Sequence, residues 1–194
     1  MDQFRSHLRE LILNHPGVLI HLETPVQLAG GDFSRDFVDG KLAVDDPENL
    51  SLAGSAMFAA AAEANVEFEA VGGLVVGAAP FTFAVSQVAR KKWFLVRKEP
   101  KGRGTNLWIE GTRIYPGMKV MIVDDVVTRG GSIKKACELV EEAGAKVVFA
   151  TTLVDRGDFA ASYFDERRIP YHPILTYKDL NIDPVGGFQH AQAV

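Results

Sequence analysis

Hydrophobic residues recur at helical and strand spacings in alternating segments along most of this chain. Phe4, Leu8, Leu11 and Ile12 lie three or four positions apart, which predicts an amphipathic helix over residues 2–14. The same pattern, with its start and stop signals, predicts helices over 48–64, 80–90 and 132–143. Short apolar runs predict strands at 18–22, 37–44, 69–74, 93–96, 107–110, 119–123 and 146–154. Alternating strands and helices are typical of an α/β fold, with a central, mostly parallel sheet flanked by helices.

Composition and charge narrow the class of protein. The chain has 194 residues and a formal net charge of −4, so no overall basic field favours nucleic acid as a partner. No apolar run reaches the ~18 residues that a membrane helix needs, and the residues after Met1 lack the apolar core of a signal peptide. The single cysteine, Cys137, excludes an intramolecular disulfide. We therefore expect a cytoplasmic protein with neither a nucleic-acid nor a membrane partner.

One segment offers an anion site beside two carboxylates. The apolar run 121–123 ends at Asp124 and Asp125, and a turn with Thr128, Gly130 and Gly131 leads into the next helix. Glycines and a helix N-terminus expose backbone N–H groups to an anion, whereas carboxylates suit sugar hydroxyls or a bridging metal. A phosphorylated sugar has a phosphate for the N–H groups and hydroxyls for the carboxylates. An ordinary turn with an acidic cap has the same spacing, so the pattern alone leaves both interpretations open.

A cationic loop is the second candidate for chemistry. Arg97, Lys98, Lys101 and Arg103 place four cations within residues 97–103. Fixed cations stabilise a departing pyrophosphate, and the glycines at 102 and 104 allow a loop to open and close. A solvated charged hairpin is the alternative, and it is a common feature of protein surfaces.

The segment 120–132 resembles the motif with which type I phosphoribosyltransferases bind 5-phosphoribosyl 1-diphosphate (PRPP). Within that family, residues 96–111 resemble the mobile loop of the orotate phosphoribosyltransferases, and 71–80 resemble their pyrophosphate loop. The segment 151–156 matches as well, and its Arg156 stands at the family's orotate-binding position. The resemblance covers roughly residues 20–160.

The resemblance implies transfer of the phosphoribosyl group from PRPP to orotate by a homodimer with a shared active site. It implies a type I phosphoribosyltransferase-like fold in three segments: an N-terminal helix and small hood at 1–44, a PRPP-binding core at 45–183 and a tail at 184–194. Lys101 and Asp125 would be catalytic, and Thr128, Arg156 and Phe37 would contact the base. Mg²⁺ would be the cofactor, held mainly through PRPP rather than by protein ligands. The implied PRPP contacts are Arg97, Lys98, Lys101, Arg103, Asp124, Asp125, Val126, Val127, Thr128, Arg129, Gly130, Gly131 and Ser132.

Two positions depart from the orotate enzymes. Ala29 stands where they usually carry a lysine, and Arg103 stands where their mobile loop usually has a histidine. Arginine keeps the cation but cannot exchange a proton near neutral pH. These departures leave open a phosphoribosyltransferase for another base. A PRPP-sensing regulator without catalysis, and a sugar-phosphate hydrolase on a similar sheet, are further alternatives.

Overall fold

A six-stranded sheet forms the centre of the protein. The computed structural model describes residues 1–28, 30–100 and 108–186. The strand order is β5-β4-β3-β6-β7-β8, and all neighbours are parallel except β4 and β5. The expected α/β class with a mostly parallel sheet is confirmed. The strands are β3 (Ala70–Leu74), β4 (Lys92–Val96), β5 (Ile109–Gly111), β6 (Lys119–Val127), β7 (Lys146–Asp155) and β8 (Leu175–Thr176).

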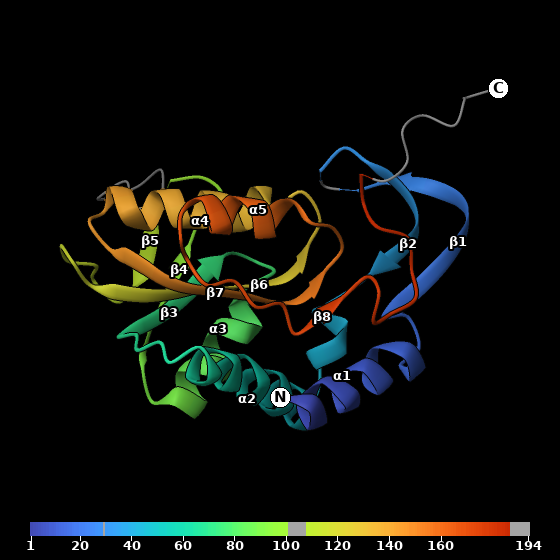
Figure 1. The fold of residues 1–194 in the computed structure, drawn as a ribbon, viewed down its shortest axis with the longest axis horizontal. Coiled ribbons are helices and arrows are strands. Elements are labelled where there is room, and N and C mark those ends of the chain that lie inside the picture. Colours follow the sequence, from blue (N-terminus) through green and yellow to red (C-terminus); the bar gives the residue numbers. More distant parts are fainter. Residues whose placement is uncertain (29, 101–107, 187–194) are drawn as a thin grey trace.

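Helices cover both faces of this sheet (Figure 1). One layer holds α4 (Gly131–Glu142) and α5 (Phe159–Glu166), and the other holds α2 (Pro47–Glu63) and α3 (Ala79–Ala89), with α1 (Asp2–Asn14) beside α2. Alternate residues of β6 supply the two cores: Met121 and Val123 join one, whereas Val120 and Ile122 join the other. None of the helices in the described residues is long and apolar enough to cross a membrane.

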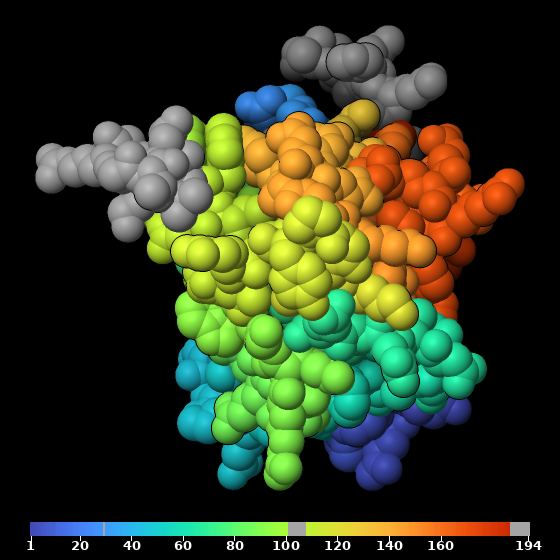
Figure 2. Space-filling model, turned by 90° about the vertical axis from the view of Figure 1, so that its left-hand side faces the viewer, coloured from blue at the N-terminus to red at the C-terminus, as the bar shows by residue number. Residues whose placement is uncertain are grey.

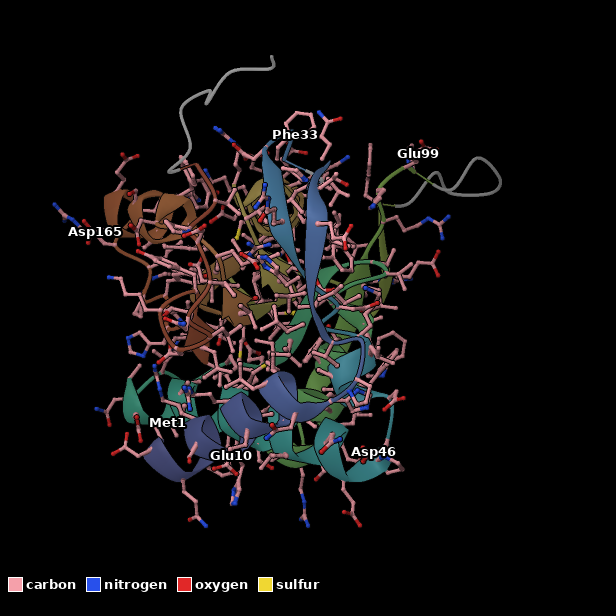
Figure 3. All side chains as sticks on the ribbon, turned by 90° about the vertical axis from the view of Figure 1, so that its right-hand side faces the viewer. Met1, Glu10, Phe33, Asp46, Glu99 and Asp165 are labelled. Carbon is pink, nitrogen blue, oxygen red and sulfur yellow. The ribbon has the colours of Figure 1, made fainter. Side chains whose placement is uncertain are left out.

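A two-stranded antiparallel hairpin stands beside the carboxyl ends of the central strands (Figures 1 and 3). It consists of β1 (Leu19–Gln27) and β2 (Phe33–Val38), and we call it the hood hairpin. Ser34, Asp36 and Val38 lie on the more buried face of β2, whereas Phe33, Arg35 and Phe37 alternate with them on the exposed face. On this buried face, Val38 joins the hydrophobic core, while Ser34 and Asp36 contact Arg156 at the end of β7.

Several predicted boundaries were wrong. The strand expected at 37–44 is β2, which begins at Phe33 and ends at Val38. The Asp39 side chain accepts hydrogen bonds from the backbone N–H groups of Lys41 (3.1 Å) and Leu42 (3.2 Å), and this turn bends the chain into a short 3₁₀ helix over Leu42–Val44. Strand β6 continues to Val127, four residues beyond the apolar run, because it pairs with β7 as far as Asp155. The sequence patterns did not predict α5 and β8.

The start of α2 matches its sequence signals and allows a stability test. Asp46 accepts hydrogen bonds from the N–H groups of Glu48 (2.8 Å) and Asn49 (2.9 Å), and Pro47 occupies the first turn. We expect Asp46→Ala to lower the free energy of unfolding by about 1 kcal/mol, because two helix N–H groups lose their partner. Asp46→Ser, which keeps a capping oxygen, should recover most of this loss in urea titrations. Equal midpoints for wild type and Asp46→Ala would contradict the capping role.

Candidate functional site

The acidic pair lies in the second half of β6, directly after the apolar residues of the strand. The Asp124 side chain is buried, with 3% of the residue exposed, and accepts a hydrogen bond from the N–H of Asp125 (3.0 Å). Burial, together with the neighbouring Asp125 charge, raises the pKa of Asp124 well above its ordinary value. The Asp125 side chain is 16% exposed, and its Oδ1 accepts from the N–H of Val126 (2.8 Å). Asp125 is therefore the member of the pair that a ligand can reach.

Three segments that are distant in sequence meet at the Asp125 carboxylate. A Cβ placed on Gly77, in the turn between β3 and α3, would lie 2.5 Å from its Oδ1. A Cβ on Gly40, just after the hood hairpin, would lie 3.0 Å from the Asp125 Cβ. The Lys41 ammonium lies 3.5 Å from Oδ2 and 3.1 Å from Asp39. Although burial lowers the pKa of Lys41, the carboxylates of Asp39 and Asp125 raise it above its ordinary value. Asp125 thus has a charged partner on the hood side.

The turn after β6 presents a row of backbone N–H groups. Gly130 takes a left-handed conformation (φ 77°), which favours glycine, and α4 begins at the next residue without a side-chain cap. Within the described residues, the N–H groups of Thr128 to Ser132 donate no hydrogen bond to protein atoms. Such open N–H groups at a helix N-terminus form a cradle for an anion. The cradle lies a few residues from Asp125 and is the candidate anion site.

The side chains of Val126, Val127 and Arg129 contact other parts of the protein. Val127 is buried in the core under α4, and Val126 packs against the opposite core. The Arg129 guanidinium forms two hydrogen bonds with Asp32 of the hood, at 2.5 and 2.6 Å. These three side chains are therefore engaged within the protein, and the turn offers a ligand its backbone N–H groups from Thr128 onward.

Arg156 lies at the end of β7 beneath the hood hairpin. It is 1% exposed, and its guanidinium donates to the Asp36 carbonyl (2.6 Å) and to Ser34 Oγ (3.1 Å). Its buried Nε has no partner among the described residues. Burial lowers the pKa of Arg156, although the nearby Asp36 charge opposes this. A ligand carboxylate at this position would have to share or replace the contacts from β2.

The remaining predicted residues lie in two other places. Phe37 is 40% exposed on the face of β2 opposite Ser34 and Asp36, so the structure does not bring it to Arg156. Arg97 follows β4 and pairs with Glu110 (2.9 Å), and the Lys98 side chain is exposed. Lys101 and Arg103, like the departing position Ala29, lie outside the described residues.

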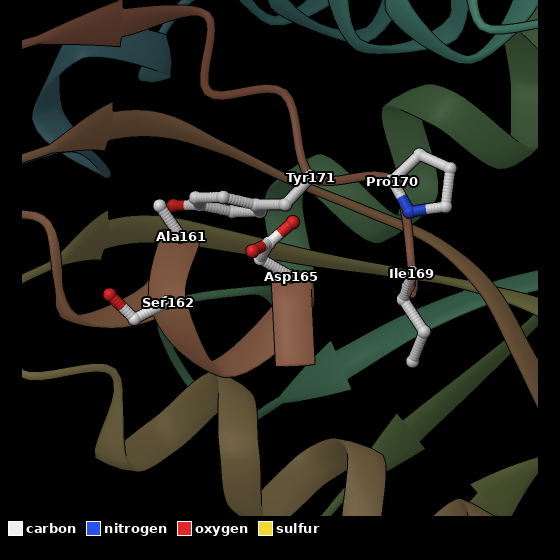
Figure 4. Close-up of a pocket in the computed structure, with 6 residues that line it drawn as sticks. All are labelled: Ala161, Ser162, Asp165, Ile169, Pro170 and Tyr171. Carbon is white, nitrogen blue, oxygen red and sulfur yellow. The ribbon is translucent and has the colours of Figure 1, made fainter. Parts of the chain in front are cut away.

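A hollow of about 470 Å³ lies elsewhere, between α5 and the segment that leads to β8 (Figure 4). None of its lining residues was predicted as a site residue; they are Ala161, Ser162, Asp165, Ile169, Pro170 and Tyr171. Tyr171 donates to Asp155 (2.8 Å), and burial raises the pKa of that carboxyl to about 6. The residues that line this hollow include no cationic side chain, and the region around Asp125 is the candidate functional site.

Comparisons with known proteins decide the family. The profile of the phosphoribosyl transferase domain matches residues 47–166. The orotate phosphoribosyltransferase of Rhodopirellula baltica is 36% identical over 166 residues, covering 81% of this chain and 86% of that relative. The chain belongs to the orotate phosphoribosyltransferase family. The solved structure of the Mycobacterium tuberculosis orotate phosphoribosyltransferase with Fe(III) dicitrate gives a TM-score of 0.75 at 29% identity, covering 92% of this chain and 99% of that one.

The same Mycobacterium tuberculosis enzyme has also been solved in complex with PRPP, with a TM-score of 0.72 and 28% identity, covering 92% of this chain and 99% of that one. The family assignment confirms the resemblance found in the sequence and identifies the chain as a phosphoribosyltransferase. It says nothing about individual side chains. The contacts of Lys41 and Asp32 with the PRPP motif come from the structure, because no motif in the sequence links the hood to residues 125–129.

Proposed function

We propose that this protein transfers the 5-phosphoribosyl group from PRPP to orotate, giving orotidine 5′-phosphate and pyrophosphate in pyrimidine nucleotide synthesis. The observation that carries the proposal is the cradle of open N–H groups from Thr128 to Ser132, a few residues from the reachable carboxylate of Asp125. A 5′-phosphate fits the cradle of N–H groups, and a ribose hydroxyl fits the Asp125 carboxylate. PRPP contains both groups in one sugar.

In the proposed transfer, different residues of the chain bind the phosphate, the ribose and the leaving pyrophosphate. The open amides of 128–132 hold the 5′-phosphate, and Asp125 accepts hydrogen bonds from the ribose hydroxyls. A nitrogen of the base forms the new bond to C1 of the sugar while the bond from C1 to pyrophosphate breaks, and its proton passes to solvent. Lys101 stabilises the negative charge that develops on the leaving oxygens, with Arg97, Lys98 and Arg103 as further cations. Asp124, being buried, supports Asp125 rather than the substrate.

Mg²⁺ is the cofactor in this proposal. Carboxylate oxygens are ligands that Mg²⁺ accepts, and it usually binds through one or two of them together with substrate phosphates. Asp125 fits this requirement, because its carboxylate is partly exposed beside the cradle. When bound, Mg²⁺ would supply positive charge that offsets the negative charge of the departing pyrophosphate, and Asp125 would be its protein ligand.

The base is assigned to the space between the hood hairpin and the end of β7. Arg156 would pair with the orotate carboxylate, and Thr128 would lie near the ring, whereas Phe37, on the other face of β2, is not assigned to the base. Support for Arg156 comes from its unpartnered Nε and from its place at the carboxyl end of a central strand, where ligands of parallel sheets bind.

Arg156→Lys tests this assignment. Lysine keeps the positive charge but loses the two-pronged contact with a carboxylate. We expect KM for orotate to rise by about tenfold, the equivalent of ~1.4 kcal/mol, while KM for PRPP changes far less. Equal rises in the two constants would show instead that Arg156 holds the hood hairpin to the core. Thermal melting of the variant separates either effect from a loss of stability.

A homodimer and a cytoplasmic location complete the proposal. The sequence resemblance supports a shared active site, and Figure 2 shows the β4–β5 edge of the sheet. Phe83 (42% exposed) and Trp93 (39% exposed) pack against each other on the surface of α3 and β4, where they offer apolar area to a second subunit. The buried free thiol of Cys137 is compatible with a reducing compartment. Light scattering at several protein concentrations tests the dimer.

A panel of acceptors tests the base. The protein is incubated with Mg²⁺, PRPP and one of orotate, adenine, guanine, hypoxanthine, uracil or nicotinate, and pyrophosphate release is scored. We expect release with orotate alone. Pyrophosphate release with another acceptor, and none with orotate, would show that the protein is a phosphoribosyltransferase for a different base. Tight PRPP binding with no release for any acceptor would favour a PRPP-sensing regulator.

A further inference from the structure

The tip of the hood hairpin is fastened to the PRPP motif by one ion pair. Arg129 Nε lies 2.5 Å from Asp32 Oδ2, and Arg129 Nη2 lies 2.6 Å from Asp32 Oδ1. The arginine thus meets both carboxylate oxygens in the planar geometry that gives such pairs their strength. The Asp32 side chain is 13% exposed and that of Arg129 is 48% exposed. The hydrogen bonds from Arg129 lower the pKa of Asp32, so the pair stays charged at neutral pH.

Two further contacts hold the Arg129 side chain in place. Its guanidinium carbon lies 5.0 Å from the centre of the Phe159 ring, a cation–π distance. On the hood side, a Cβ added to Gly30 would lie 3.2 Å from Arg129 Cγ, so the turn of the hairpin fits closely over the arginine stem. The Arg129 side chain, although half exposed, therefore lies between the hairpin tip and α5, and Asp32 compensates its charge.

This pair joins two parts of the proposed active site. Arg129 belongs to the turn that forms the phosphate cradle, whereas Asp32 directly precedes β2. Strand β2 carries Ser34 and Asp36, which contact Arg156 at the proposed base position. A fixed hairpin tip consequently fixes the residues beside the base relative to the cradle that holds the sugar phosphate.

We infer that Asp32 and Arg129 are positioning residues, and that their pair sets the distance between the base-binding and phosphate-binding halves of the site. Arg129 acts through the hood, and the PRPP phosphate is bound without its side chain. The kinetic test of this inference rests on the proposed function, because it measures KM for orotate. The hydrogen-exchange test depends only on the geometry of the hood hairpin.

Four variants test the pair: Asp32→Asn, Arg129→Gln, the double variant, and the charge swap Asp32→Arg with Arg129→Asp. Glu141→Gln is the matched control, because it removes the charge from another arginine–carboxylate pair, between Glu141 on α4 and Arg167 just after α5. The kinetic readouts are KM for orotate, KM for PRPP and the PRPP dissociation constant by calorimetry. Hydrogen exchange of the amides of β1 and β2 reports on the hairpin without any need for turnover.

We expect each single variant to raise KM for orotate by about threefold to fivefold, the range of a partly exposed ion pair, and to leave PRPP affinity within about twofold. The double variant should be no worse than either single one, and the charge swap should recover most of the loss. Exchange in the hairpin should quicken in the single variants and stay unchanged in the control.

A tenfold loss of PRPP affinity in Arg129→Gln but not in Asp32→Asn would overturn the inference, because Arg129 would then contact the phosphate directly. Additive effects in the double variant, or unchanged KM for orotate in the single ones, would overturn it as well. If the wild type transferred nothing to orotate, the proposed function would fail on its own. Hydrogen exchange would still decide whether the pair holds the hairpin.

Discussion

Asp125→Asn is expected to weaken PRPP binding by about 10- to 100-fold, since hydrogen bonds to a charged group contribute about 1.5–3 kcal/mol. Asparagine has the same shape but offers one oxygen and no charge to the ribose hydroxyls. Its amide would also lose the ion pair with Lys41, which lies 3.5 Å from Asp125 Oδ2. The fold should survive, because the change removes no buried apolar contact. Calorimetry with PRPP and Mg²⁺ gives the affinity.

The matched control for this prediction is Asp165→Asn. Asp165 is an exposed carboxylate on α5, outside the proposed site, so the same chemical change there should leave PRPP affinity unaltered. Full PRPP affinity in Asp125→Asn would show that the ribose hydroxyls find their partner elsewhere. The assignment of the acidic pair would then be wrong, even if the enzyme remained active.

Gly77→Ala is expected to be nearly as damaging, although it adds only one methyl group. The new Cβ would stand 2.5 Å from Asp125 Oδ1 and 2.8 Å from its Cγ, closer than real Cβ atoms approach other atoms. The carboxylate cannot easily move aside, because the N–H of Val126 holds its Oδ1 at 2.8 Å. Asp125 would have to leave its present rotamer, and PRPP affinity should fall by about tenfold, equivalent to ~1.4 kcal/mol.

A double-mutant cycle separates this effect from damage to the turn itself. If Gly77→Ala acts by displacing Asp125, it should cost little in a protein that already carries Asp125→Asn. The loss in the double variant should then match that of Asp125→Asn alone. If instead the loss of PRPP affinity in the double variant equals the product of the two single losses, the turn between β3 and α3 contributes to PRPP binding independently of Asp125.

The sequence predicted most of the elements, because their signals are local. The helix over 48–64 has its cap and proline in adjacent positions, and the observed α2 begins at Pro47. The end of β2 was missed because it depends on one side chain, Asp39, whose hydrogen bonds to the N–H groups of Lys41 and Leu42 compete with the strand. Strand β6 extends past its apolar run because pairing with β7 decides its length.

The centre of the candidate site could also be identified from sequence, since Asp124 to Ser132 are contiguous. The contacts that surround it could not. Lys41, Gly77 and Asp32 come from three other segments, and only the folded chain brings them to Asp125 and Arg129. For Arg129 the structure adds something that the motif does not contain: its side chain faces the hood, and the backbone faces the cradle.

The central claim is transfer of a phosphoribosyl group from PRPP to orotate at the site around Asp125. The most direct measurement follows orotate absorbance and pyrophosphate together, after wild-type protein is mixed with Mg²⁺, PRPP and orotate. We expect orotate to disappear one for one with pyrophosphate formed, and Asp125→Asn to slow both equally. Undiminished orotate, under conditions in which calorimetry shows PRPP bound, would contradict phosphoribosyl transfer to orotate.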